Sequence, residues 1–163
     1  MKQIKIGNFI VGGDTLTLIA GPCTLESLEL GLEIGTKVKD LCVKYGFNYI
    51  FKASYDKANR TSIYSRRGPG MEKGLQWLAE IKEKLNVPVL TDIHESCQAA
   101  PVAEVADVLQ IPAFLCRQTD LLVAAAKTDR AINVKKAQFL SAYDMKSVYT
   151  KLIEAGNDNV MLC

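Results

Sequence analysis

Long apolar runs are missing from this sequence of 163 residues, in which no stretch of about 18 consecutive apolar residues occurs,. A helix that crosses a bilayer needs about 20 such residues, so we expect no membrane span. Met1–Lys5 is not followed by the apolar core of a secretory signal,. A strong charge of one sign is also missing, because the net charge is only +2. This balance argues against nucleic acid as a general partner.

Histidine and paired cysteines are scarce. His94 is the only histidine, and the five cysteines are odd in number, scattered, and without a C-x-x-C motif. A secreted disulfide framework uses an even number of cysteines, so we expect these thiols to be reduced, as in the cytosol. The composition, 48% hydrophobic and 23% charged, is that of a globular protein,. We therefore predict a soluble cytoplasmic protein with a buried core.

Short apolar strands alternate with amphipathic helices along the chain. A small hairpin at 4–11 comes first, and each later strand pattern ends in glycine, proline or polar residues,. Ser27 is placed to cap the first helix and Gly46 to end it, and Thr119 to cap a later alanine-rich helix. The apolar stripe of the first helix is Ile34, Val38, Leu41, Cys42 and Tyr45. The strands predicted after the hairpin are 16–20, 49–53, 87–90, 108–111, 131–134 and 159–163.

This alternation predicts an α/β fold with a parallel sheet, because strands covered by helices on both faces are apolar throughout. About eight such units of about 25 residues give the usual size of a TIM (β/α)8 barrel. A doubly wound sheet is the competing architecture, but no G-x-G-x-x-G motif opens a helix,. We predict a single barrel domain over 1–163 with an N-terminal β-hairpin over 1–13. Only about six strands are present, so the chain is expected to be truncated at its C-terminus.

Polar and cationic groups follow the predicted strands, where chemistry gathers in α/β folds. The segment 51–70 carries five cations against the single acid Asp56, interleaved with hydroxyl and amide groups. Such a segment is a candidate cradle for phosphate or carboxylate, although a solvated basic loop is the alternative. Together the strand ends predict an anionic small molecule at one face of the barrel. The other polar strand ends are 21–23, 92–95, 110–113 and 133–136.

Single residues at these strand ends leave several chemistries open. Cys23 could be a metal ligand, a nucleophile paired with His94, or a small core residue. Asp92, His94 and Glu95 are of metal-ligand type, but they also suit an ordinary polar strand end. Lysines such as Lys135 could form a Schiff base or bind phosphate as point charges, and Lys52 has the same two readings. Arg117–Asp120 could simply cap a helix.

Longer motifs resemble 3-deoxy-D-manno-octulosonate 8-phosphate synthase, also called 2-dehydro-3-deoxyphosphooctonate aldolase. The likeness runs from about Leu16 to the last residue. The loop Lys57-Ala-Asn-Arg60 resembles the pentose-phosphate enzyme rather than the related heptulosonate phosphate synthases. The motifs are IAGPCTLES at 19–27, FKASYDKANR at 51–60, RGPG at 67–70, TDIHE at 91–95, QIPAFLCRQTD at 110–120 and INVKK at 132–136.

The resemblance implies a TIM-barrel homotetramer that condenses phosphoenolpyruvate with D-arabinose 5-phosphate. Phosphate leaves by C–O cleavage, and the product feeds lipopolysaccharide assembly in Gram-negative bacteria. The residues expected to carry the catalysis are Lys52, Lys57, Asp92, His94 and Lys135. Those expected to bind substrate are Ser54, Asn59, Arg60, Thr61, Gln110, the backbone of Ala113, and Arg117 from a neighbouring subunit.

Within this resemblance, each group of residues has an expected partner. Phosphoenolpyruvate would meet Lys52, Ser54, Lys57 and Gln110 through its carboxylate and neighbouring atoms, and Lys135 and Ala113 through its phosphate. The sugar phosphate would meet Asn59, Arg60, Thr61 and Arg117, and Asp92 and His94 would line the sugar side. Fixed cations would offset the repulsion between the two anions.

Cys23 places the sequence with the metal-dependent branch of that family. A thiolate and an imidazole favour zinc, iron or manganese over magnesium. The remaining ligands, a His, a Glu and an Asp, belong to later strands of the family and are absent here. Two alternatives therefore stay open: a catalytically inactive fragment that acts only in binding or assembly, and a related heptulosonate phosphate synthase or Schiff-base aldolase.

Overall fold

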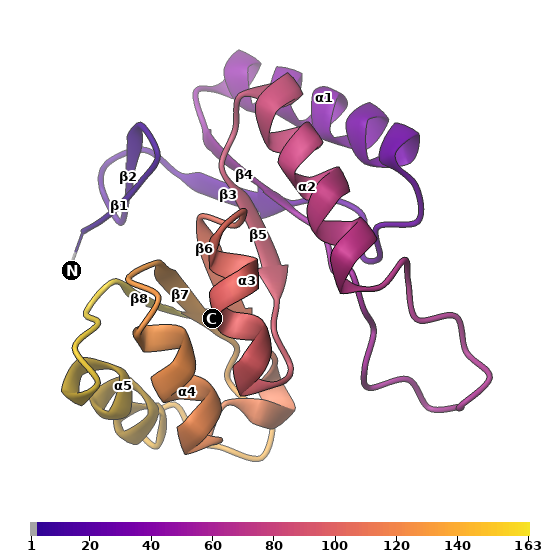
Figure 1. Ribbon diagram of the computed structural model, residues 1–163. Coiled ribbons are helices and arrows are strands. Elements are labelled where there is room, and N and C mark those ends of the chain that lie inside the picture. The colour runs from indigo at the N-terminus through magenta and orange to yellow at the C-terminus, as the bar shows by residue number, and fades with distance from the viewer. Residues whose placement is uncertain (1–2) are drawn as a thin grey trace. The chain divides into compact units, whose positions relative to one another are not determined.

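The computed structural model describes residues 3–163. The chain divides into two compact units, Met1–Thr91 and Asp92–Cys163. In both units, parallel strands follow one another in chain order and are joined through helices (Figure 1). The first two residues of the hairpin predicted over 1–13 lie outside the described residues.

The first unit begins with an antiparallel hairpin and continues with parallel strands. In the hairpin, Ile4 pairs with Val11 and Ile6 with Phe9. Strand β3 pairs with β4 along its whole length, and β4 pairs with β5. Helices α1 and α2 lie side by side (Figure 1). The elements are β1 (Ile4–Ile6), β2 (Phe9–Val11), β3 (Thr17–Ala20), α1 (Leu28–Tyr45), β4 (Asn48–Lys52), α2 (Met71–Leu85) and β5 (Val89–Asp92).

The second unit repeats the same pattern with shorter helices. Strand β7 pairs in parallel with β6 on one side and β8 on the other. All four residues of β6 and of β7 are buried, as expected of strands covered on both faces,. The elements are η1 (Ser96–Gln98), α3 (Ala99–Ala103), β6 (Val108–Ile111), η2 (Ala113–Leu115), α4 (Thr119–Ala126), β7 (Ala131–Val134), α5 (Met145–Glu154) and β8 (Val160–Leu162).

The ends of α1 are those that the sequence predicts. The Ser27 hydroxyl accepts a hydrogen bond from the Leu30 amide at 3.1 Å, and Gly46 ends the helix with a left-handed φ of 71°. The packed face of α1 differs from the predicted apolar stripe. Leu41 is 52% exposed and Tyr45 60% exposed, whereas Gly31 and Gly35 are buried. The helix thus packs through its glycines.

Replacing Ser27 with alanine is expected to lower the free energy of unfolding by about 1 kcal/mol, because the cap satisfies one of the four free amides of the first turn. Urea unfolding of the purified chain measures the change. Ser147→Ala in the exposed part of α5 is the matched control, and it should be neutral or slightly stabilising because alanine has the higher helix propensity,. Equal effects of the two substitutions would show that Ser27 does not act as a cap.

The start of α4 corrects one prediction. Gln118 is the N-cap and makes no side-chain cap bond, while Thr119 is the first helical residue. The Thr119 hydroxyl instead accepts a hydrogen bond from the Lys151 ammonium of α5 at 2.8 Å. Thr119 therefore joins α4 to α5, and a long-range partner has replaced the local cap that the sequence predicts.

The predicted fold class is confirmed. Parallel strands in chain order, each followed by helical structure, form the β/α pattern of a TIM barrel, whereas a doubly wound sheet reverses its strand order,. The hairpin at 4–11 is present. That residues 1–163 form one barrel domain stays a prediction. No helix among residues 3–163 is both long and apolar enough to cross a membrane.

Candidate functional site

Three polar side chains meet where β4 ends in the first unit. Ser54 is fully buried, and its hydroxyl oxygen accepts hydrogen bonds from the ammonium groups of Lys52 at 3.0 Å and Lys57 at 2.8 Å. Two like charges that share one neutral acceptor repel each other, and an anionic ligand would offset that repulsion. The predicted grouping of Lys52, Ser54 and Lys57 is therefore present.

The end of β3 is held against the end of β4. The Tyr49 hydroxyl donates to the Ala20 carbonyl at 3.1 Å, and the Leu25 amide donates to the Ser54 carbonyl at 3.0 Å. Gly21 makes this approach possible, because a Cβ there would lie 2.2 Å from the Lys52 carbonyl oxygen. The loop after β3 thereby brings Cys23 beside the lysine cluster, which consists of Lys52, Lys57 and the Ser54 that they share.

The Cys23 thiol is exposed and lies in an electropositive setting. A hydrogen bond from Lys57 lowers the pKa of Cys23 below its ordinary value. Partial burial opposes this effect, and the charges of Lys57, Lys52 and Arg60 add to it. A thiolate is the reactive and ligating form of cysteine. The residues around Cys23 thus favour the ionised form over the core role that the sequence left open.

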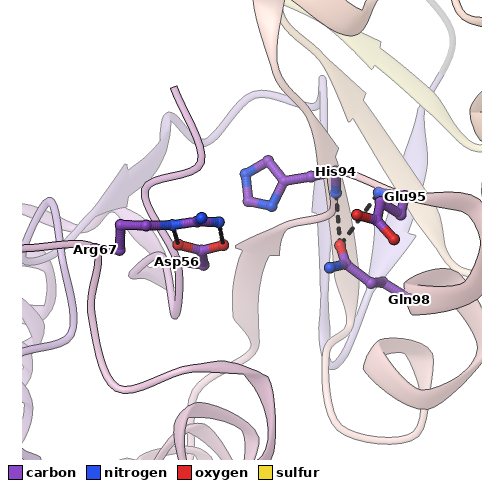
Figure 2. Close-up of polar contacts among 5 residues, drawn as sticks. All are labelled: Asp56, Arg67, His94, Glu95 and Gln98. Carbon is purple, nitrogen blue, oxygen red and sulfur yellow. Dashed lines mark hydrogen bonds and ion pairs between the residues drawn. The ribbon is translucent and has the colours of Figure 1, made fainter. Parts of the chain in front are cut away.

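The basic segment after β4 is closed at its base. The Lys57 amide donates to the Arg67 carbonyl at 2.8 Å. The Arg67 guanidinium also makes two hydrogen bonds to the Asp56 carboxylate, one from Nε to Oδ1 at 2.7 Å and one from NH2 to Oδ2 (Figure 2). Beyond this base the segment is solvated, since Ile63 is 90% exposed. The tip of the segment is thus the solvated loop of the second reading, and the anion cradle at its start stays a prediction.

The predicted sugar-phosphate residues lie on the exposed part of this segment. Asn59, Arg60 and Thr61 are all exposed, and the Arg60 guanidinium donates to the Thr24 hydroxyl at 3.4 Å. This contact turns Arg60 back toward the loop that carries Cys23. Arg60 therefore reaches the neighbour of Cys23, and its charge acts on the thiol, while the sugar-phosphate roles stay predictions.

In the second unit, two predicted residues meet at buried strand ends. Asp92, at the end of β5, accepts a hydrogen bond from the Gln110 side-chain amide of β6. Each of the two residues is 7% exposed. Buried carboxylates and amides cost free energy unless they are hydrogen-bonded, so this pair has a fixed geometry.

His94 is held by the turn that follows it. The Gln98 side-chain oxygen accepts hydrogen bonds from the amides of His94 at 2.7 Å and Glu95 at 3.3 Å, and a reciprocal bond completes a capping box with Glu95 (Figure 2). The structure therefore positions His94 through its backbone. Its role toward a sugar stays a prediction.

The remaining predicted residues of the second unit are more exposed. Lys135 follows β7 and is exposed, and its amide donates to the Ile111 carbonyl at 3.1 Å. Ala113 begins η2 and is half-buried. Arg117 is exposed, and its carbonyl accepts a hydrogen bond from Lys151 at 3.1 Å. Their contacts with substrate stay predictions.

A metal does not fit the residues present. Among residues 3–163, no three His, Cys, Asp or Glu side chains lie together as a ligand group. Cys23 alone would be one donor, and its sulfur already takes a hydrogen bond from Lys57. Metal centres with cysteine ligands use three or four protein ligands, so a metal at Cys23 requires donors beyond these residues.

Three residues that support these side chains were missed by sequence reasoning. Thr24 forms a parallel bridge with Ser54 and receives Arg60, Gln98 holds His94, and Asn133 donates to Gln110 at 2.9 Å. Gln98 has a readable signal, the E-x-x-Q spacing of a capping box. Asn133 has a weaker one, a lone amide inside an apolar strand.

Comparison with known proteins identifies the family of this chain. The DAHP synthetase I family model matches residues 2–163. A 2-dehydro-3-deoxyphosphooctonate aldolase from Fusobacterium nucleatum is 57% identical over 100% of this chain and 59% of its own length. Proteins of the same name from Desulfotalea psychrophila and Marinobacter nauticus are 59% and 58% identical over 99% of this chain and 58% of their lengths. The chain thus spans about three fifths of these relatives, and it belongs to the DAHP synthetase I family.

Proposed function

We propose that this chain takes part in the condensation of phosphoenolpyruvate with D-arabinose 5-phosphate, which yields 3-deoxy-D-manno-octulosonate 8-phosphate and phosphate for lipopolysaccharide assembly. The observation that carries the proposal is the cluster in which Lys52 and Lys57 share the hydroxyl of buried Ser54. Relatives that bear the aldolase name at 57–59% identity support the substrate pair.

The cluster suits the central difficulty of this reaction, which is to bring two anions together. Lys52 and Lys57 supply two fixed positive charges for the carboxylate of phosphoenolpyruvate, and buried Ser54 keeps both ammonium groups in place before the ligand arrives. Preorganised charges of this kind need no rearrangement when substrate binds. We assign the second anion to Arg60, whose guanidinium donates to the Thr24 hydroxyl. We assign Lys135 to the phosphate of phosphoenolpyruvate.

The test measures phosphate release from phosphoenolpyruvate by the purified chain, with and without D-arabinose 5-phosphate. If the chain turns over, Arg60→Ala and Lys135→Ala are each expected to reduce kcat/KM at least about tenfold, the cost of one charged contact. Lys37→Ala on the exposed face of α1 is the control and should leave the rate unchanged. Full activity in both site variants would refute the assignment of these residues.

The same assay separates the competing functions. A heptulosonate product requires a four-carbon aldose phosphate by carbon count, so preference for that acceptor would favour the related synthase. Borohydride trapping of a substrate adduct on Lys52 or Lys135 would reveal a Schiff-base aldolase. Calorimetric binding of phosphoenolpyruvate without any turnover would identify a chain that acts only in binding or assembly.

Three further properties follow from the family resemblance and stay proposals. They are a divalent metal that includes Cys23 among its ligands, a homotetramer in which Arg117 reaches a neighbouring subunit, and a cytoplasmic location. Comparing the metal content of the unmodified chain with that of Cys23→Ser tests the metal site, and analytical ultracentrifugation tests the homotetramer. If the chain holds metal, a metal content that is unchanged by Cys23→Ser would remove Cys23 from the ligand set.

A further inference from the structure

A buried chain of polar side chains crosses three strand ends of the second unit. We name Asp92, Gln110 and Asn133 the polar ladder. They stand on β5, β6 and β7 and are 7%, 7% and 4% exposed. Gln110 Nε2 donates to Asp92 Oδ1, and Asn133 Nδ2 donates to Gln110 Oε1 at 2.9 Å. Asn133 Nδ2 also lies 3.5 Å from the Cys163 sulfur.

The polar ladder can run in only one direction. An ionised carboxylate has no hydrogen to donate, so Asp92 must face the amide nitrogen of Gln110. The amide oxygen of Gln110 then faces Asn133, which must present its own nitrogen. If the Gln110 amide turned over, its oxygen would meet a carboxylate oxygen and its nitrogen would meet the Asn133 nitrogen. Both contacts would then be repulsive and buried.

We propose that Asn133 is a positioning residue, which together with the Asp92 carboxylate holds the Gln110 side chain so that it presents N–H rather than oxygen beside Asp92. An amide nitrogen carries two hydrogens, and the one not used by Asp92 can donate to an anionic ligand. A reversed amide would offer that ligand an oxygen and repel it. The statement about the ligand rests on the proposed function, whereas the direction of the polar ladder does not.

The direction of the polar ladder can be tested by exchanging the residue types at its two ends, positions 92 and 133. Asn133→Asp places an acceptor opposite the Gln110 oxygen, so either orientation of the amide leaves one repulsive contact, and the urea midpoint should fall. Asp92→Asn alone leaves an amide at each end of the polar ladder, so either orientation of Gln110 can be satisfied and the midpoint should change little. In the double variant Asp92→Asn/Asn133→Asp, a reversed Gln110 is satisfied at both ends, and the midpoint should return close to that of Asp92→Asn.

Orientation and binding are then read separately on the full chain. Nuclear Overhauser contacts of the Gln110 side-chain amide protons should move from residue 92 to residue 133 in the double variant. Phosphoenolpyruvate, measured by calorimetry, should bind the double variant at least tenfold more weakly than it binds the unmodified chain, which carries the same net charge. A residue with a merely structural role would restore affinity together with stability.

Two results would overturn the proposal: a double variant that is no more stable than Asn133→Asp, or one that binds phosphoenolpyruvate as tightly as the unmodified chain does. If the unmodified chain binds no phosphoenolpyruvate, the proposed function fails on its own. The stability rescue and the amide contacts then decide the direction of the polar ladder without any ligand.

Discussion

Replacing Gly21 with alanine is expected to lower the free energy of unfolding by about 3 kcal/mol, at the upper end of the usual cost of overpacking. The added Cβ would lie 2.2 Å from the carbonyl oxygen of Lys52 and 3.2 Å from its amide nitrogen. This obstacle is backbone, and β4 cannot withdraw without disturbing its pairing with β3 and β5. Urea unfolding followed by the fluorescence of Trp77, the single tryptophan, measures the loss.

Gly13→Ala is the matched control for this substitution. A Cβ at Gly13 would meet its nearest atom at 3.8 Å, which is ordinary van der Waals contact. Its effect should stay within about 0.5 kcal/mol, as for surface substitutions in general. If Gly21→Ala proved as stable as Gly13→Ala, the close approach of the two strand ends would not exist in solution.

Replacing Lys57 with methionine is expected to slow the alkylation of Cys23 by iodoacetamide several-fold at pH 7. The hydrogen bond from Lys57 is the largest cause of the lowered pKa of Cys23. Its removal raises that pKa toward the ordinary value, so less thiolate is present at pH 7 and the pH–rate profile moves to higher pH. Mass spectrometry of the peptide that contains Cys23, with a chelator present, gives the rate.

Two references make this measurement specific. Lys37→Met removes an exposed lysine that pairs with Glu33 on α1, and it should leave the Cys23 rate unchanged. Within each sample, buried Cys42 should react slowly, because burial raises its pKa. An unaltered Cys23 rate in Lys57→Met would mean that Lys57 does not hydrogen-bond to the sulfur.

The alternation of strands and helices could be predicted from the sequence because each element carries its own local signal. Ser27 and Gly46 mark the ends of α1, and both act as predicted. The packed face of α1 could not be predicted, because apolar periodicity gives glycine no weight. A Cβ at Gly35 would lie 2.4 Å from Leu85, and one at Gly31 would lie 2.7 Å from Ile81, so the helix lies close to its neighbours through these two positions.

The candidate site, like the fold, could be predicted from the sequence only in part. The family resemblance grouped Lys52, Ser54 and Lys57 with Gln110, and the first three are in contact because they share one short segment. The role of Asn133 was not predicted, because its partner Gln110 stands on another strand. Which residues meet across a sheet depends on strand order and register, and a single sequence shows neither. Polar residues inside apolar strands are therefore the ones whose role is hardest to predict.

The closed base of the basic segment separates a packed part of the molecule from an exposed one. The Gly70 amide donates to the carbonyl of buried Tyr55, and Lys57 and Arg67 are joined through their backbones. Residues 58–66 therefore form a lobe whose length does not set the spacing of Lys52 and Lys57. Because the entropy of loop closure grows only slowly with length, insertions at this tip cost little. The length of this lobe can thus change while the geometry of Lys52, Ser54 and Lys57 stays the same.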